Sequence, residues 1–165
     1  MSTTASHRAG SHAYAARLLW TGNRREGTAD YAGYGRGYRI SIAGKPDIVG
    51  TAAAAFLGEP DVHDPEDFFL AAIASCHMLA YLALCARSGV VVTGYEDHAD
   101  GTLALDERGG GRFERVTLRP VVTVADAAYA GRALALHDAA HRRCFIAASC
   151  SVPIGHEAVV RVEGA

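Results

Sequence analysis

Residues 64–89 constrain the fold more than any other part of the chain. The stretch reads DPEDFFLAAIASCHMLAYLALCARSG, and it is apolar on nearly every face from Phe68 to Ala86. Asp64 can cap a helix, Pro65 suits the first helical position, and Gly89 is a natural stop. Because a helix that is apolar all round must be enclosed, this stretch predicts a long central helix.

This stretch is also long enough to span a bilayer, which takes about 20 apolar residues. Acidic residues precede it, Arg87 follows it, His77 lies near its centre, and the chain has no second segment of this kind. We therefore favour a soluble helix, covered by a sheet or by a partner subunit, over a transmembrane helix.

The length of 165 residues fits one folded domain with a substantial core. The first residues are rich in Ser, Ala and Arg and contain no acid, which faintly resembles a transit peptide, but a polar disordered tail explains them equally well and we give the targeting interpretation little weight. We expect a tail over residues 1–13 and a single domain over residues 14–165.

The charge and the cysteines restrict the partners and the compartment. A formal charge of -2 leaves no excess of cations for phosphates or anionic lipid, so we expect neither nucleic acid nor a membrane as a partner. Four cysteines without a secretory segment indicate a reducing compartment, and we expect the cytoplasm.

Hydrophobic periodicity predicts strands on both sides of the central helix. A second helix is expected over residues 127–143, with Leu134 and the alanines around it in its apolar stripe. The return strand after a glycine turn should direct Val116, Leu118, Val122 and Val124 to one face. The order strands, helix, strands, helix, strand favours an α+β fold. The expected strands cover residues 13–20, 31–42, 48–56, 90–107, 112–124 and 156–164.

Cys76 is the first candidate for chemistry. A buried free cysteine is more often inert packing, and it becomes a nucleophile only where a nearby cation stabilises the thiolate. His77 is a poor base for it, because neighbours in a helix point about 100° apart. The sequence therefore disfavours a Cys–His hydrolase dyad.

The second candidate is the segment over residues 140–153, which holds Cys144 and Cys150. On one helix, His137, His141 and Cys144 would share a face, and these are ligands that zinc accepts. The alternative is that the histidines interact with the helix dipole and solvent. We favour this alternative because no Cys-x-x-Cys spacing supports a metal site.

A set of short motifs, in this order, resembles the OsmC/Ohr family of osmotically inducible and organic hydroperoxide resistance proteins, in its OsmC-like subgroup. The resemblance covers nearly the whole chain from about Tyr14. The motifs are Trp20-Thr-Gly22, Gly27-Thr28, Asp64-Pro65-Glu66-Asp67 with Cys76 ten residues after Glu66, Val92 through Tyr95, Val116-x-Leu118-x-Pro120, and Cys144-Phe-Ile-Ala-Ala-Ser149 followed by Pro153.

The resemblance implies an intertwined homodimer with antiparallel sheets wrapped around a long central helix. It also implies a thiol peroxidase without a cofactor or metal, which reduces organic hydroperoxides and is itself reduced by a small or protein dithiol. Cys76 would be oxidised to a sulfenic acid and Cys144 would then form a disulfide with it. Glu66 would orient an arginine that keeps Cys76 as thiolate.

Three features of this chain leave alternatives open. The best-known family members carry Cys-Pro at the second cysteine, whereas Phe145 follows Cys144 here, so Cys150 is a second candidate for the resolving thiol. Arg25 and Arg36 are both candidates for the activating arginine. The third alternative is a non-catalytic member of the family, which binds a metal ion or a small hydrophobic ligand in the pocket that would otherwise hold the peroxide.

The spacing of Glu66 and Cys76 predicts how the site is assembled. The two residues are ten positions apart, which on a straight helix is about 15 Å along the axis. Either the helix bends or two chains contribute, and we expect a site at the interface of a homodimer.

Overall fold

The computed structural model describes residues 10–164. The fold is α+β, as predicted, and the chain divides between Pro65 and Glu66 into two compact units, each of which we describe by itself. Residues 1–9 of the expected N-terminal tail lie outside the described residues.

The N-terminal unit is built around an antiparallel sheet in the order β1-β2-β3. The Trp20 indole donates a hydrogen bond to the Gly35 carbonyl at 2.8 Å, which closes the long loop between β1 and β2. A Cβ on Gly22 would lie 1.8 Å from the same carbonyl oxygen, so this close approach requires glycine. The elements are β1 (Arg17–Trp20), β2 (Tyr38–Ser41), β3 (Ile48–Gly50) and the 3₁₀ helix η1 (Ala54–Phe56).

The predicted central helix is α1, Pro65–Arg87. The helix stops just before Gly89, as expected from the sequence. Gly89 has a φ of +72°, and the Val90 amide donates to the Cys85 carbonyl at 3.0 Å. By length and composition α1 would pass as a membrane span, and 28% of its most apolar window is buried. Its buried residues pack on strands and on a second helix of the same unit.

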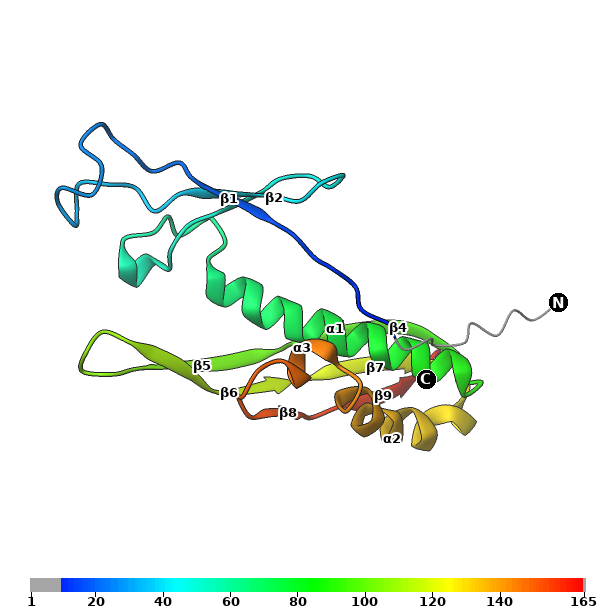
Figure 1. The fold of residues 1–165 in the computed structure, drawn as a ribbon. Coiled ribbons are helices and arrows are strands. Elements are labelled where there is room, and N and C mark those ends of the chain that lie inside the picture. Colours follow the sequence, from blue (N-terminus) through cyan, green and yellow to red (C-terminus); the bar gives the residue numbers. More distant parts are fainter. Residues whose placement is uncertain (1–9, 165) are drawn as a thin grey trace. The chain divides into compact units, whose positions relative to one another are not determined.

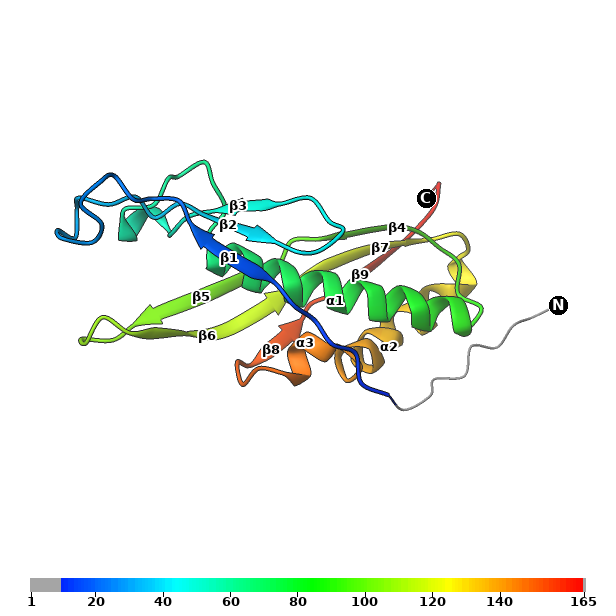
Figure 2. The same ribbon diagram turned by 45° about the horizontal axis from the view of Figure 1, so that its top comes forward.

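The C-terminal unit holds two three-stranded sheets, in the orders β4-β7-β9 and β5-β6-β8. The pairs β4-β7 and β5-β6 are antiparallel, whereas β6-β8 and β7-β9 are parallel, which the expectation of antiparallel sheets did not include. In Figures 1 and 2, α1 lies along these strands. The strands are β4 (Val92–Asp97), β5 (Asp100–Leu105), β6 (Gly111–Leu118), β7 (Pro120–Val124), β8 (Ile154–His156) and β9 (Val159–Val162).

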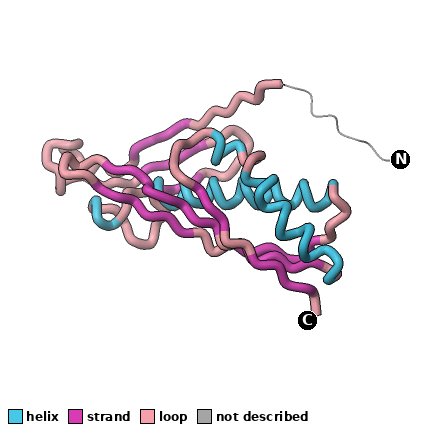
Figure 3. Tube along the Cα trace, turned by 90° about the horizontal axis from the view of Figure 1, so that it is seen from below, coloured by secondary structure: helices cyan, strands magenta, loops and turns pink. Residues whose placement is uncertain are grey.

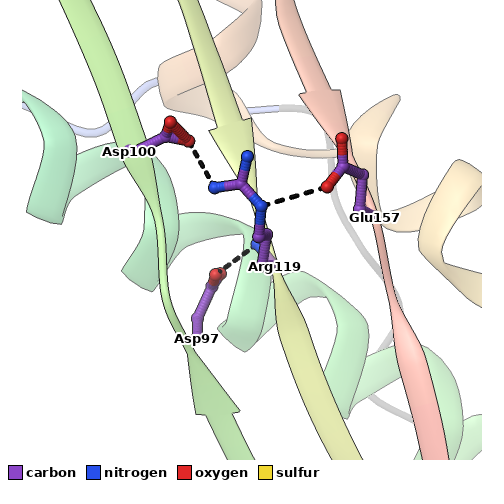
Figure 4. Close-up of polar contacts among 4 residues, drawn as sticks. All are labelled: Asp97, Asp100, Arg119 and Glu157. Atoms are coloured by element: carbon purple, nitrogen blue, oxygen red, sulfur yellow. Dashed lines mark hydrogen bonds and ion pairs between the residues drawn. The ribbon is translucent and has the colours of Figure 1, made fainter.

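Three stretches of chain, residues 92–105, 111–124 and 154–162, each pass from one of these sheets to the other. Arg119 lies where they change sheet and contacts the other two stretches (Figure 4). Its amide donates to Asp97 Oδ1 at 2.7 Å, its Nε to Glu157 Oε2 at 3.0 Å, and its Nη1 to Asp100 Oδ1. Arg119 therefore links all three stretches at the point where each one passes from one sheet to the other.

The core has two clusters, and α1 contributes to both. Ile73 packs with Val116 and Leu118 in one cluster, while Tyr81 packs with Val122 and Val124 in the other. All four predicted inward residues of the return strand are at most 1% exposed, so that prediction is confirmed.

The second helix is α2, Ala130–His141, which follows the 3₁₀ helix η2 (Ala127–Tyr129). The prediction that Leu134 lies in its apolar stripe is wrong, because Leu134 is 49% exposed. Of the alanines predicted around it, Ala133 is buried, and it shares the buried face with His137 and Ala140 at the i, i+4, i+7 spacing. The sequence reasoning also missed the four-residue helix α3 (Phe145–Ala148) and β8, both labelled in Figures 1 and 2, while Figure 3 distinguishes helices from strands along the same chain.

We expect Ile73→Ala to lower the free energy of unfolding by about 3 kcal/mol, because it leaves a cavity between α1 and the strands. Leu105→Ala is the control: Leu105 is 59% exposed, so its truncation should cost well under about 1 kcal/mol. Urea unfolding measures both. Equal losses for the two variants would contradict the assignment of Ile73 to the core.

Candidate active site

Cys76 and Cys144 are brought together in the C-terminal unit, and their side chains are in hydrogen-bonding contact. Cys76 lies in the middle of α1 and is half-buried, whereas Cys144 precedes α3 and is 1% exposed. Both are free thiols. The residues that the resemblance pairs are therefore neighbours in space, although they are far apart in sequence.

The local structure holds Cys144 in place. Its sulfur accepts a hydrogen bond from the Ala147 amide at 3.4 Å, which caps α3, and it lies 4.0 Å from the Ile73 carbonyl on α1. Burial raises the pKa of the Cys144 thiol to about 11, against the lowering effect of the Ala147 amide. Cys144 is thus protonated at neutral pH, and it is a weak nucleophile in this state.

The other two thiols have different surroundings. Cys85 is buried in contact with Tyr81, and burial raises its pKa, so it belongs to the core as expected. Cys150 lies with its sulfur 3.5 Å from the Ala147 carbonyl and lines a pocket of about 520 Å³ with Phe69, Phe113, Arg112 and other residues. The contact with Cys76 thus favours Cys144 over Cys150 as the resolving thiol.

The remaining predicted site residues lie elsewhere in the two units. Glu66 is in the first turn of α1. Arg36 is held inside its own loop, because its guanidinium donates to the Tyr31 and Tyr34 carbonyls and lies over both tyrosine rings. Arg25 has a φ of 108°, and its amide donates to Asn23 Oδ1 at 2.9 Å. Both arginines belong to the N-terminal unit, and their pairing with Cys76 stays a prediction.

Two buried histidines form a pair close to the thiols: His77 follows Cys76 directly, and His137 precedes Cys144 by seven residues. The sequence reasoning did not predict this pair. Nε2 of His77 on α1 is 3.1 Å from Nδ1 of His137 on α2, and the two rings are nearly parallel. The His156 ring lies 5.9 Å from His77 and 5.7 Å from His137, and it contacts Asp138 at 3.0 Å. The only sequence signal was the position of His77 and His137 on the apolar faces of their helices.

The zinc hypothesis gains no support from this geometry. His137 is engaged with His77, and Cys144 is engaged with Cys76, so the proposed ligands have other partners. Across residues 10–164, no group of three or more His, Cys, Asp or Glu side chains is arranged to hold a metal ion.

Burial keeps both histidines uncharged. It lowers the pKa of His77 from 6.5 to about 4, helped by the nearby His156 and His141. It lowers the pKa of His137 to about 3, helped by His77 and His156. At neutral pH the pair is therefore neutral, with one shared hydrogen bond.

We expect the protein to lose stability as the pH falls below 6.5. The unfolded histidines take up protons near pH 6.5, while the folded ones take them up only near pH 4 and 3, so acid favours the unfolded state. Each neutral histidine should cost about 1.4 kcal/mol per pH unit in this range. Urea unfolding at pH 7.5 and 5.0 measures this, and His137→Asn should reduce the slope. An equal slope in that variant would contradict the assignment.

Solved structures share this fold. An OsmC-like protein of unknown function from Vibrio cholerae is 28% identical, with a TM-score of 0.80 over 90% of this chain and 100% of that chain. The organic hydroperoxide resistance protein from Elizabethkingia anophelis is 16% identical, with a TM-score of 0.67 over 94% of this chain and 100% of that chain. OhrB of Bacillus subtilis, another organic hydroperoxide resistance protein, is 21% identical, with a TM-score of 0.56 over 90% and 98%.

A search of the curated proteins gave no match. The family comparison is decisive instead, because the sequence model of the OsmC-like proteins matches residues 58–157, which is more than half of the chain. This range includes α1, both sheets of the C-terminal unit up to β8, and all four cysteines. The chain belongs to the OsmC-like protein family.

Proposed function

We propose that this protein is a cysteine-based thiol peroxidase that reduces organic hydroperoxides to alcohols. The observation that carries the proposal is the contact between Cys76 and Cys144. Two free thiols in contact, one half-buried and one buried, can serve as a peroxidatic and a resolving cysteine.

The proposed cycle has three balanced steps. The Cys76 thiolate attacks the outer peroxide oxygen, the O–O bond breaks, and a proton completes the alcohol, which leaves Cys76 as a sulfenic acid. The Cys144 thiol then attacks the Cys76 sulfur, an S–S bond forms, and the hydroxyl leaves with the thiol proton as water. A dithiol reduces this disulfide by exchange and becomes a disulfide itself.

The surroundings of the two thiols support this order. Cys76, on α1, is partly accessible to solvent. Cys144 is almost fully buried, and its pKa is raised to about 11. A thiol with so high a pKa reacts slowly with free peroxide, whereas its contact with Cys76 places it for attack on the oxidised Cys76 sulfur as it loses its proton. We propose that Arg25 or Arg36, oriented by Glu66, stabilises the Cys76 thiolate.

The names of two similar structures agree with organic hydroperoxides as the substrate class. The structures from Elizabethkingia anophelis and Bacillus subtilis are named as organic hydroperoxide resistance proteins. At these identities they carry the fold alone, so the substrate remains our proposal. We further propose that the protein works in the cytoplasm, where a dithiol pool is available and thiols stay reduced.

We also propose that a second copy of the chain covers the outer face of α1. Leu79 on this face is 63% exposed, and its neighbours along the helix include the exposed Ala71, Ala83 and Ala86. An apolar helix face of this length is normally covered in a soluble protein. A homodimer would also allow Glu66 of one chain to act at the thiols of the other.

The first experiment is intact-mass analysis with peptide mapping after one equivalent of cumene hydroperoxide. We expect the wild-type protein to lose two thiols as a Cys76–Cys144 disulfide and to recover them with a dithiol. Cys76→Ser should not react. Cys144→Ser should stop at the sulfenic acid.

Cys150→Ser is the matched control, and it should still form the disulfide. A Cys76–Cys150 disulfide in the wild type would assign the resolving role to Cys150. An unchanged mass would contradict the peroxidase, and the non-catalytic member that binds a small hydrophobic ligand would then replace it.

The dimer is tested by Leu79→Glu. A charge in a buried interface is costly, so this variant should sediment mainly as a monomer, while the wild-type protein sediments as a dimer. Leu105→Glu, at another exposed leucine, should remain a dimer. A wild-type monomer with intact peroxidase activity would contradict a site assembled from two chains.

A further inference from the structure

The histidine pair and the thiol pair connect the same two segments of the C-terminal unit. Cys76 and His77 are consecutive residues of α1. His137 lies on α2, and Cys144 follows seven residues later, just beyond the end of that helix. Any displacement of α2 relative to α1 therefore changes both contacts together.

The contact between the two histidines lies in the core of the C-terminal unit. His77 is 1% exposed and His137 is 0% exposed, and the His137 ring is stacked on Tyr81 with 4.0 Å between the ring centroids. The outer nitrogens, Nδ1 of His77 and Nε2 of His137, have no hydrogen-bond partner among the described residues. The inner bond is thus the polar contact that the two rings share, and losing it would leave both rings unpaired in the core.

The bond exists in this form only while the pair is neutral. One imidazole must donate and the other must accept, so the pair has two arrangements that differ in which ring donates. A first proton on either ring would place a charge in the core. The titratable groups that face this charge are His156 from β8, His141 and Asp138 from α2, and Tyr81 from α1. A second proton would put hydrogens on both facing nitrogens, and the bond would break.

We infer that the His77–His137 pair positions Cys144 for the disulfide-forming step, by fixing α2 to α1 beside the two thiols. The inference rests on the proposed function. His77 and His137 are positioning residues, because they act on the reaction through Cys144. Loss of the pair should slow the attack of Cys144 on the oxidised Cys76 and leave the first oxidation of Cys76 unchanged.

The chemistry explains why only the second step depends on the pair. Oxidation of Cys76 needs the peroxide and one thiolate on α1. The second step forms an S–S bond of about 2.05 Å between two segments, so its rate follows how often the two sulfurs reach attack geometry. A small displacement of a reacting group can reduce such a rate by about 100-fold.

The experiment compares two variants in single-turnover reactions with stoichiometric cumene hydroperoxide at pH 7.5. His137→Leu removes the bond but keeps the core apolar. In the double variant His77→Gln with His137→Asn, the amide groups reach the positions of the facing nitrogens and cannot be protonated. His98→Gln is the control, since His98 is exposed and pairs with Glu96. Rapid quenching with a sulfenic-acid trap separates the two steps by mass.

We expect His137→Leu to form the sulfenic acid within about twofold of the wild-type rate and the disulfide at least about tenfold more slowly. The double variant should form the disulfide within about threefold of the wild-type rate. Between pH 7 and 5 the wild-type pair stays neutral, so the disulfide step should have the same pH dependence in the double variant as in the wild type. His98→Gln should match the wild type in both steps.

Three results would overturn the inference. The first is a folded His137→Leu protein that forms the disulfide at the wild-type rate. The second is an equal slowing of both steps, which would indicate general damage to the site. The third is a double variant that forms the disulfide as slowly as His137→Leu does. Circular dichroism and urea unfolding establish that each variant is folded.

Diamide separates this inference from the proposed function, because it oxidises two neighbouring thiols to a disulfide and is itself reduced to the hydrazine. If the wild-type protein ignores hydroperoxide, the peroxidase proposal fails. The rate of diamide-driven Cys76–Cys144 coupling then tests the positioning role, and His137→Leu should again be at least about tenfold slower. An equal rate would reject it.

Discussion

The burial of α1 is the constraint on which the C-terminal unit depends. A helix of 23 residues is about 35 Å long, whereas a typical strand spans only about 17–20 Å. One three-stranded sheet could not cover it. Two sheets placed along the helix cover its inner face, and Ile73 packs over one of them while Tyr81 packs over the other. Arg119 joins the three stretches of chain where they pass between the sheets, so a charged residue occupies the junction instead of the core.

The sequence predicted those parts of the fold that local chemistry decides. The ends of α1 and the inward face of Val116, Leu118, Val122 and Val124 were correct, because the Gly89 stop and the period-two pattern are local signals. The parallel pairings of β8 and β9 were not predictable, since three or four residues carry too little pattern. Leu134 was misplaced because α2 buries alanines and a histidine, so the largest apolar side chain did not mark the buried face.

The candidate site was only partly accessible from the sequence. Periodicity placed Cys76 in the helix, but its contact with Cys144 joins residues 68 positions apart, and only the family resemblance indicated the pairing. The histidine pair joins residues 60 positions apart and has no motif. Helical spacing instead placed His137, His141 and Cys144 on one face, for which a zinc site was the alternative that we disfavoured. Helical spacing shows which residues share a side of a helix, but it does not show what lies opposite them.

The same burial that stabilises α1 determines where charge can appear. Low solvent access raises the pKa of Cys144, Cys85 and Tyr81 and lowers the pKa of His77 and His137, so each of these groups is neutral at pH 7. A reaction that needs a thiolate must therefore begin at the edge of this core, and Cys76 is the half-buried thiol in contact with it. In the cycle that we propose, Cys144 needs no charge before the first oxidation, because the sulfenic acid of Cys76 is the electrophile. A neutral core and a partly exposed thiol are thus two consequences of packing one helix.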